Sequence, residues 1–523
     1  MNLPLPLNMR TQKGGCILRH STEIRAPMTL WERFLSIFSK RAAENHMMAR
    51  YGYDGASPQR RHEGWVSVGG NAEQINSASR EIIRRKVRDL ERNSDIANSV
   101  IGAYTRNVVG SGFLPQADTG DEELNAQIEV LFDEWQKPAN CDITGSQSFL
   151  EICNMLVRRM VVDGGMIFVK VRGGDGNIPF QLQAREVSDL DGDYWNSYAS
   201  RGATIIGGVE VNAYGKPLAY HIKQLSPDGW DLGSTKRMPA SDVIAVWQKT
   251  MPSQIREMPP MAVAVSRVAD AEDFMNTVSI KEKILASLAV FIKRQEPLTP
   301  TMGRAPTAQK ETDRYGRMRV SPGMVQELLP GDDVQAVIPN GQATNTREMA
   351  SIYNRLLSAG QGLSYEAVSR DMSQVNYSSA RQGLLEDQKT YQRMQRFLID
   401  HFLDVLYEEI VVAGVTSGKL AIPDFWANKA QYLKHTWTLP GWSWIDPVKE
   451  VNANKIAMES GQTTLASVCA SRGEDWQDVL RQRAKEMALQ QELYAEYGVI
   501  PEKGDETDEE TTVLDEANSE EQE

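Results

Sequence analysis

The chain has 523 residues, of which 41% are hydrophobic and 24% are charged, so it is long enough for several globular domains. Its formal net charge of −13 excludes a protein that binds nucleic acid through an overall positive charge. Cys16, Cys141, Cys153 and Cys469 form no CxxC pair, and we expect reduced thiols in a soluble protein made in the cytoplasm. No apolar run approaches the roughly 18 residues of a membrane span.

The N-terminal half predicts helices followed by strands. Residues 1–55 are irregular and mixed in charge, and we expect an arm. Apolar residues at three- and four-residue steps predict a helix or helix pair over 79–109, and further helices over 122–135 and 149–162. Strands are then expected at 166–171, 180–182, 204–211, 219–222 and 243–247, which make a β-rich module.

The first helical segment carries a basic face that we interpret as solvated. It consists of Arg84, Arg85, Lys86, Arg88 and Arg92.

The C-terminal half is dominated by long helices. Pro259-Pro260 opens a helix whose apolar stripe runs from Met261 to Ile292, a length of roughly 48 Å that suits packing beside copies of itself. Residues 346–357 predict a helix and 360–377 a loop. Ser379 and Gln382 fit a capping box, which predicts a helix from 379 to about 412 that stops at Gly414.

The end of the chain changes character. Two or three short helices are expected from Trp437 to about Tyr497. Residues 502–523 then hold eleven acidic residues and one lysine, a net charge of −10 that leaves about −3 for the rest of the chain. Such a tail cannot bury enough apolar surface to fold, so we expect it to be disordered.

No motif requires catalysis. In Gly414-Val-Thr-Ser-Gly418-Lys419 the glycines are one residue too close for a phosphate-binding loop, and Leu420 stands where a magnesium-binding hydroxyl belongs. Asp189, Asp191 and Asp193 lack the glycine and glutamate of a calcium loop and are interpreted as a polar turn. The alternative is a metal-dependent nuclease or terminase site built on them. We expect no cofactor, no metal and no enzyme activity.

Three segments form specific motifs. They are Gly362-Leu-Ser-Tyr-Glu-Ala-Val-Ser-Arg-Asp371 followed by Asn376-Tyr-Ser-Ser-Ala-Arg381, then Pro440-Gly-Trp442 followed by Trp444-Ile-Asp446-Pro447 and Lys449-Glu450, and lastly Asn107-Val-Val-Gly110-Ser-Gly112. Together they resemble the portal proteins of lambda-type tailed bacteriophages over roughly residues 75–490. Pro252, Gln254 and Arg256 add weaker support, and Glu257 departs from the pattern because that family usually has glycine there.

The family-signature positions are Gly362, Leu363, Ser364, Tyr365, Asn376, Tyr377, Ser378, Ser379, Arg381, Trp444, Asp446, Pro447, Lys449 and Glu450.

The resemblance implies an α+β portal fold with a wing, a long-helix stem, a β-rich clip and a helical crown. Copies would form a ring, typically of twelve, at one capsid vertex of a virion assembled in the host cytoplasm. Double-stranded DNA would pass through the ring without sequence specificity during packaging and ejection. The implied partners are the terminase large subunit, the major capsid protein, the scaffold, and head-completion or tail connector proteins, with no membrane.

The same resemblance divides the chain. It implies a first wing part (56–165), the clip module (166–257), the stem helix (258–293), a second wing part with a channel-facing loop and a long helix (294–436) and the crown (437–498). The arm (1–55) and the acidic tail (499–523) are expected from composition, and neither the residues before Met28 nor the tail has a clear counterpart in the family. We expect the channel wall in the loop 364–377 or the segment 296–320. The candidate channel-facing residues are Lys293, Arg294, Arg304, Lys310, Arg370 and Asp371.

Overall fold

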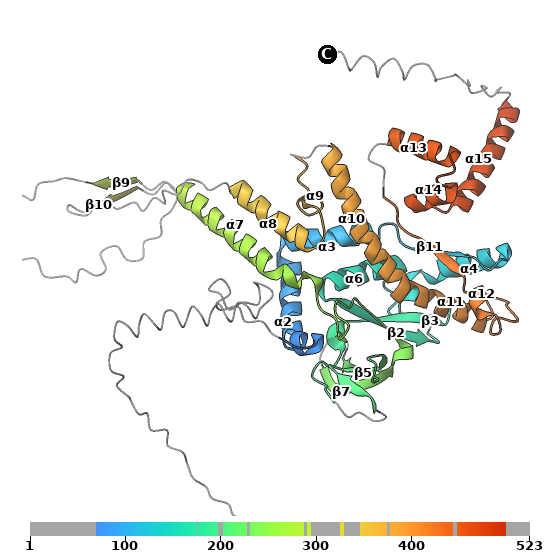
Figure 1. The fold of residues 1–523 in the computed structure, drawn as a ribbon, viewed down its shortest axis with the longest axis horizontal. Helices are drawn as coiled ribbons and strands as arrows, with labels where there is room; N and C mark the ends of the chain where they lie inside the picture. Colours follow the sequence, from blue (N-terminus) through green and yellow to red (C-terminus); the bar gives the residue numbers. More distant parts are fainter. Residues whose placement is uncertain are drawn as a thin grey trace, which may run out of the picture. The chain divides into compact units, whose positions relative to one another are not determined.

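The chain is a mixed α+β protein (Figure 1). The computed structural model describes residues 69–174, 176–196, 202–226, 228, 231–286, 290–293, 325–328, 346–373, 377–442 and 447–497. The chain divides into two units, 1–69 and 70–523, and all contacts described below lie in the second unit. In the described part, no helix combines the length and the apolar character that crossing a bilayer requires.

Helices make up most of the described chain. They are α2 (Ala72–Asn93), α3 (Asp95–Val108), α4 (Glu122–Trp135), α5 (Pro138–Cys141), α6 (Phe149–Val162), α7 (Val265–Ala286), α8 (Thr346–Gly360), α9 (Tyr365–Ser369), α10 (Tyr377–Leu398), α11 (Asp404–Thr416), α12 (Lys429–Tyr432), α13 (Pro447–Glu459), α14 (Leu465–Arg472) and α15 (Trp476–Tyr497). A π-helical turn, η7 (Ile399–Leu403), joins α10 to α11, and 3-10 turns lie at η3 (Val187–Asp189), η5 (Ala240–Asp242) and η6 (Pro260–Val263).

The strands form four small sheets. They are β1 (Leu114–Ala117), β2 (Gly165–Arg172), β3 (Phe180–Arg185), β4 (Thr204–Ile206), β5 (Val209–Val211), β6 (Pro217–Leu225), β7 (Asp231–Pro239), β8 (Val243–Trp247), β9 (Val290–Lys293), β10 (Val325–Leu328) and β11 (His435–Thr438). The sheets have the orders β3-β2-β8, β4-β5-β6-β7 and β1-β11, all antiparallel, and the parallel pair β9-β10.

Local sequence explains several helix starts. Asn71 and Gln74 form a capping box at α2, and Ser148 and Glu151 form one at α6. The side chain of Ser94 caps α3 directly after α2 ends. The predicted helix pair over 79–109 is therefore confirmed, with its break at a serine that satisfies the backbone of the second helix.

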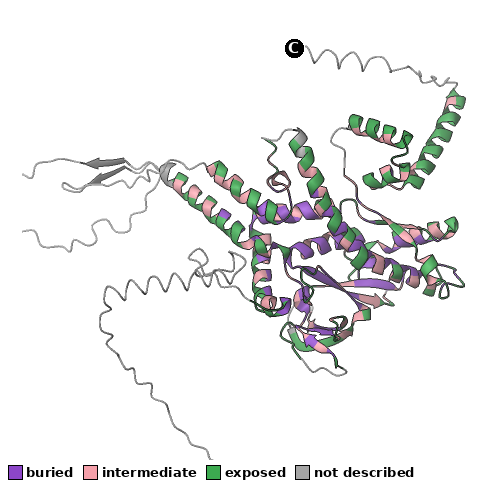
Figure 2. Cartoon of the chain, in the orientation of Figure 1, coloured by how far each residue is buried: buried purple, intermediate pink, exposed green. Residues whose placement is uncertain are grey.

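Aromatic side chains fill the main core. Phe402 of η7 lies 4.8 Å from Phe168 of β2, and Phe149 of α6 lies 5.3 Å from Trp135 of α4, measured between ring centroids. The indole N–H of Trp135 donates to the carbonyl oxygen of Phe180 at 2.8 Å. Buried residues therefore concentrate in α3, α6 and β2 (Figure 2).

A second core lies on the other face of the β3-β2-β8 sheet. Because strand side chains alternate between faces, Met166 and Phe168 join the main core, whereas Ile167 and Val169 pack with strands β5 and β6. Strand β2 is thus a wall shared by two cores. The β-rich residues 166–257 are built into the body of the protein through this wall.

The structure corrects three helix predictions. The long helix ends at Ala286 instead of Ile292, and Val290–Lys293 pairs as a strand with Val325–Leu328. Helix α10 begins at Tyr377, so Ser379 lies inside it and the predicted capping box is wrong. Gly414 lies inside α11, which runs to Thr416, and a Cβ at this position would clash with the side chain of Leu131, so the glycine allows close packing and does not end the helix.

Other elements were not predicted at all. Strand β7 is polar and exposed, as expected for an edge strand, so it carries no apolar alternation. Strands β1 and β11 pair across more than 300 residues, which no local pattern can reveal. Trp437 belongs to β11, so the helical C-terminal part begins later than expected, at Pro447. A short helix, α9, interrupts the predicted loop 360–377.

Replacing Phe402 by alanine should lower the free energy of unfolding by about 3–5 kcal/mol, because the cavity left between β2 and α6 cannot collapse fully. Urea unfolding followed by tryptophan fluorescence measures this loss. The control is Trp426→Ala, whose side chain is exposed and should cost less than about 0.5 kcal/mol. Equal midpoints for the two variants would contradict the core described above.

Candidate functional site

A cluster of buried charges lies where α2 meets the turn before α7. Glu257 is fully buried, and its carboxylate accepts from Arg84 Nη2 at 2.5 Å and from Arg256 Nε at 2.8 Å. Arg80 Nε donates to the carbonyl oxygen of Glu257 at 2.8 Å and Arg80 Nη2 to Glu73 at 2.6 Å. Glu73 in turn accepts from the backbone N–H groups of residues 255 and 256.

This cluster joins three parts of the body. Arg256 also donates to the carbonyl oxygens of Gly207 and Val187, next to the β4-β5-β6-β7 sheet. Burial by itself would raise the pKa of Glu257, but the charges and hydrogen bonds of Arg256 and Arg84 lower it overall. Glu257 is therefore held as an ion, and the turn that precedes α7 is anchored to α2 and to the second sheet.

The cluster changes the interpretation of the basic helix face. Arg84 is buried, and Arg88 pairs with buried Asp163 at 2.6 Å and with Glu186 at 2.8 Å. The reading of this face as solvated was wrong for these two residues, although Arg85, Lys86 and Arg92 are exposed. The sequence did contain a signal for a shared environment of these arginines. Arg80, Arg84 and Arg88 recur every four residues and therefore lie along one stripe of the helix.

The loop between α8 and α10 is tied to its surroundings by signature residues. The hydroxyl of Ser364 accepts from the N–H of Ala367 as the N-cap of α9, and it donates to Asp387 at 2.6 Å. Gly362 has a φ of +69°, and its carbonyl oxygen accepts from Thr390 at 2.8 Å. Tyr104 donates to the carbonyl oxygen of Gln361 at 2.6 Å, which fastens the loop to α3.

Arg370 ends α9 in the left-handed region, with a φ of +55°. It is the one described residue other than glycine with a positive φ, which costs of order 1 kcal/mol or more. Burial, followed by the nearby charge of Arg370, lowers the pKa of Arg106. Next to it, the carboxylate of Asp371 accepts from the backbone N–H of Ser373 at 3.0 Å. The loop therefore presents a positive charge on strained backbone.

Helices α7 and α8 pack side by side (Figure 1). Phe274 of α7 lies 6.0 Å from Tyr353 of α8, between ring centroids. Apolar side chains remain exposed beside this contact: Met275 and Ile280 on α7 and Ile352 and Leu356 on α8. The pair thus carries apolar surface that the described residues leave exposed.

Helices α13, α14 and α15 bury very little. Cys469 is the single buried residue among their described side chains (Figure 2). Their exposed apolar residues are Val448, Val451, Ile456, Met458, Leu465, Trp476, Leu480, Met487, Leu489, Leu493 and Tyr497. Isolated helices are marginal in water, so helices without a core of their own need partners to stabilise them.

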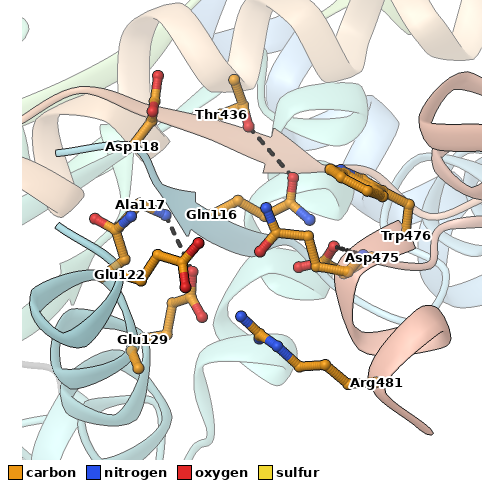
Figure 3. A pocket seen from close by; sticks show the side chains of 12 residues that line it. Gln116, Ala117, Asp118, Glu122, Glu129, Thr436, Asp475, Trp476 and Arg481 are labelled. Carbon is orange, nitrogen blue, oxygen red and sulfur yellow. Dashed lines mark hydrogen bonds between the residues drawn. The ribbon is translucent and has the colours of Figure 1, made fainter. Parts of the chain in front are cut away.

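A polar pocket of about 220 Å³ lies between β1, α4 and the first turn of α15 (Figure 3). Glu129 accepts from the backbone N–H of Ala117 at 3.2 Å, and burial together with Asp475 raises its pKa. Asp475, Trp476 and Arg481 face it from the α15 side. The pocket therefore lies at the contact between α4 and α15. Its side chains include no nucleophile paired with a general base, so the pocket lacks the groups needed for covalent catalysis.

The acidic triplet forms no cluster. Asp189 lies near Arg185, Asp191 accepts from Thr235 at 3.0 Å, and Asp193 is exposed. Within the ranges that the structure describes, no group of three His, Cys, Asp or Glu side chains is placed to hold a metal ion. Lys419 belongs to the segment that was compared with a phosphate-binding loop, and it forms an ion pair with Glu134 at 2.9 Å.

Comparison with known proteins decides the family. A family model described as "Phage portal protein, lambda family" matches residues 58–395, which is more than half of the chain. The chain belongs to the lambda family of phage portal proteins. As a portal protein it is a structural component of the virion and not an enzyme, which confirms both the resemblance and the functional class inferred from the sequence.

Relatives extend the match over most of the chain. The chain is 24% identical over 449 residues to the probable portal protein of Halomonas phage phiHAP-1, covering 83% of this chain and 85% of the relative. It is 23% identical to the portal protein of Escherichia phage N15 and 24% identical to portal protein B of Escherichia phage lambda, each covering 76% of this chain and 82% of the relative.

Solved structures give a looser similarity. The chain is similar to a chain in the neck of a native gene transfer agent particle computed with C12 symmetry, with a TM-score of 0.36, 14% identity and coverage of 74% of this chain and 92% of that one. A chain in the virion of the native particle gives a TM-score of 0.37 at 14% identity, covering 76% and 92%.

The predicted site residues of this portal protein do not form one site. The residues Gly362, Leu363, Ser364, Tyr365, Arg370 and Asp371 lie in or next to α9, where Leu363 is buried in the main core and the Tyr365 ring lies under the guanidinium of Arg355. Arg381 and Glu450 line one surface pocket between α10 and α13. Lys293 ends β9, Tyr377, Ser378 and Ser379 open α10, and Pro447 and Lys449 open α13. Arg294, Arg304, Lys310, Asn376, Trp444 and Asp446 lie outside the described residues.

Replacing Glu257 by glutamine should cost roughly 3–5 kcal/mol, because two buried guanidinium groups lose their counter-charge. Chemical denaturation at pH 7 measures the loss. The control is Glu81→Gln, which also contacts Arg84 but is 58% exposed, and it should cost less than about 1 kcal/mol. Equal costs would show that the buried pairs do not stabilise the fold.

The native chain and Glu257→Gln also allow a test of how stability depends on pH. The folded pKa of Glu257 is lowered, so its contribution is fully present above the unfolded pKa, about 4.3, and is lost as the pH falls through the folded pKa. Stability of the native chain should therefore fall more steeply below about pH 4.3 than that of Glu257→Gln. Parallel stability curves for the two proteins would contradict the lowered pKa.

Proposed function

We propose that copies of this chain assemble into a ring, of about twelve subunits, at one capsid vertex. The observation that carries this proposal is the uncovered apolar surface on α7, α8 and α13–α15, together with the family assignment. A single chain leaves this surface in water, whereas neighbouring copies in a ring would bury it. The ring would dock the terminase large subunit during packaging and head-completion or tail connector proteins afterwards. The major capsid protein and scaffold would surround it.

We assign α7 and α8 to the stem and α13–α15 to the crown. The stem then consists of two packed helices instead of one helix over 258–293. The sequence placed the clip at 166–257, but the sharing of β2 between two cores supports a wing position for those residues. The clip would instead be formed by residues 287–345, which the chain inserts between the two stem helices.

Conduction of DNA is favoured by weak binding along the channel. Apart from the tail the chain is close to neutral, at about −3, so it offers no deep electrostatic well in which a duplex would stall. We propose that the α8–α10 loop, with Arg370 and Asp371, lines the channel. Lys293, Arg294, Arg304 and Lys310 are the second candidates, because they belong to the segment 287–345 proposed for the clip.

Ring formation should depend on the apolar face of α7. Ile280 is 57% exposed, so Ile280→Glu leaves the folded chain intact but places a charge where a neighbour would pack. Mass photometry and rotationally averaged negative-stain images should show rings for the native chain and mostly single chains for the variant. Ser279→Glu, one residue away and also exposed, is the matched control and should keep the ring. A native chain that stays monomeric at all concentrations would overturn the ring proposal.

The channel assignment has its own test in phage heads. Trypsin should cleave after Arg370 more slowly in DNA-filled heads than in empty heads, because DNA would cover the loop. Cleavage after Lys236, which is exposed on the edge strand β7 of the β-rich region, should proceed at the same rate in both and serves as the control. Equal rates at Arg370 would remove this loop from the channel wall.

A further inference from the structure

A groove of about 710 Å³ lies between the end of β8 and the junction of α10 with η7. Its floor is apolar and includes Tyr220, Trp247 and Ile255, and its α10 side is formed by Arg393, Phe397 and His401. None of the described residues that line it is acidic. A groove of this size fits a ligand or a short peptide segment.

The cations of this groove differ from others on the same helix. Elsewhere on the exposed surface of α10, Lys389 pairs with Glu386 at 2.7 Å and Arg396 with Asp400 at 3.0 Å. Within the described part of the chain, neither Arg393 nor Lys249 makes an ion pair, although both line the groove. An exposed cation pair beside apolar walls fits a partner that combines negative charge with an apolar anchor.

The π-helical turn shapes the helix side of the groove. Phe397 and His401 stack with their ring centroids 4.3 Å apart, and His401 Nδ1 lies 3.1 Å from the carbonyl oxygen of Phe397. Single π turns inside α-helices are often found at functional positions. The side of the groove opposite α10 also has exposed apolar side chains nearby in the sequence. Tyr214 is 95% exposed, and Leu218 and Met251 are also exposed.

The C-terminal segment of the chain has the complementary chemistry. Residues 502–523 carry a net charge of −10, and their only apolar side chains are the adjacent Val513 and Leu514, followed by Ala517. We propose that this acidic tail docks in the groove, with Asp and Glu side chains facing Arg393 and Lys249 and the Val513-Leu514 pair against the apolar floor. The proposal goes beyond ring formation and does not depend on it.

Nucleic acid fits the groove less well. Tyr220 and Trp247 are only 5% and 8% exposed, so they offer no free ring face on which a base could stack. A duplex would supply phosphates for the cations but no aliphatic group for the floor. The tail supplies both, from the same polypeptide at a high effective concentration.

The test uses the full chain with p-benzoylphenylalanine in place of the exposed Tyr214, which directly precedes Gly215 of the groove lining. After irradiation at low salt, we expect cross-linked peptides that map to residues 498–523. The control is the same photoreactive group in place of Trp426, which is exposed elsewhere and should not reach the tail. Cross-links from position 214 that map to another segment, or to DNA, would overturn the proposal.

Matched variants make the test specific. Arg393→Gln combined with Lys249→Gln should lower the cross-link yield at least fivefold. Lys389→Gln combined with Arg396→Gln removes the same charge from paired positions outside the groove and should change the yield less than twofold. Equal losses for both pairs would show attraction to the general surface charge and would also overturn the proposal.

A mixing experiment distinguishes the source of the tail. A photoreactive chain that lacks residues 502–523 is combined with an isotope-labelled complete chain. Labelled cross-links indicate a tail donated by a neighbouring copy. A loss of all cross-links in this mixture, while the complete photoreactive chain still forms them, indicates that each groove holds the tail of its own chain.

Discussion

A carboxylate that is removed from water has to keep its counter-charges, and Glu257 imposes this condition on three parts of the chain. Arg84 belongs to α2, Arg256 reaches the second sheet, and Glu257 itself lies in the turn that leads into α7. Moving any one of these parts would leave a buried charge unpaired. Charge pairing therefore contributes to fixing the direction in which α7 leaves the body.

The resemblance drawn from the sequence implies a glycine at the position of Glu257. A glycine there would offer no charge to Arg84. In this chain a fully buried glutamate stands at the same place, and the surrounding arginines compensate for it. The departure from the family pattern is thus accommodated by charge pairing.

The body and the assembly surfaces follow different physical rules. In the body, β2 carries apolar residues on both faces because each face meets a core. Around it, α7, α8 and α13–α15 keep apolar residues in water, and the contact between α15 and the body includes a polar pocket. In the proposed ring this division would be functional, since a structural ring needs rigid subunits with surfaces that only neighbours complete.

The sequence by itself determined the family, the near-neutral body, the acidic tail and the bounds of α4 and α6, which lie at 122–135 and 149–162 as predicted. These features depend on local periodicity, on local charge and on short motifs of neighbouring residues. Only the tertiary structure decided the buried cluster around Glu257, the pairing of β1 with β11 and the sharing of β2 between two cores. Each of these depends on contacts between residues far apart in the chain, and burial in such contacts decides whether a charged residue such as Arg84 is solvated or paired.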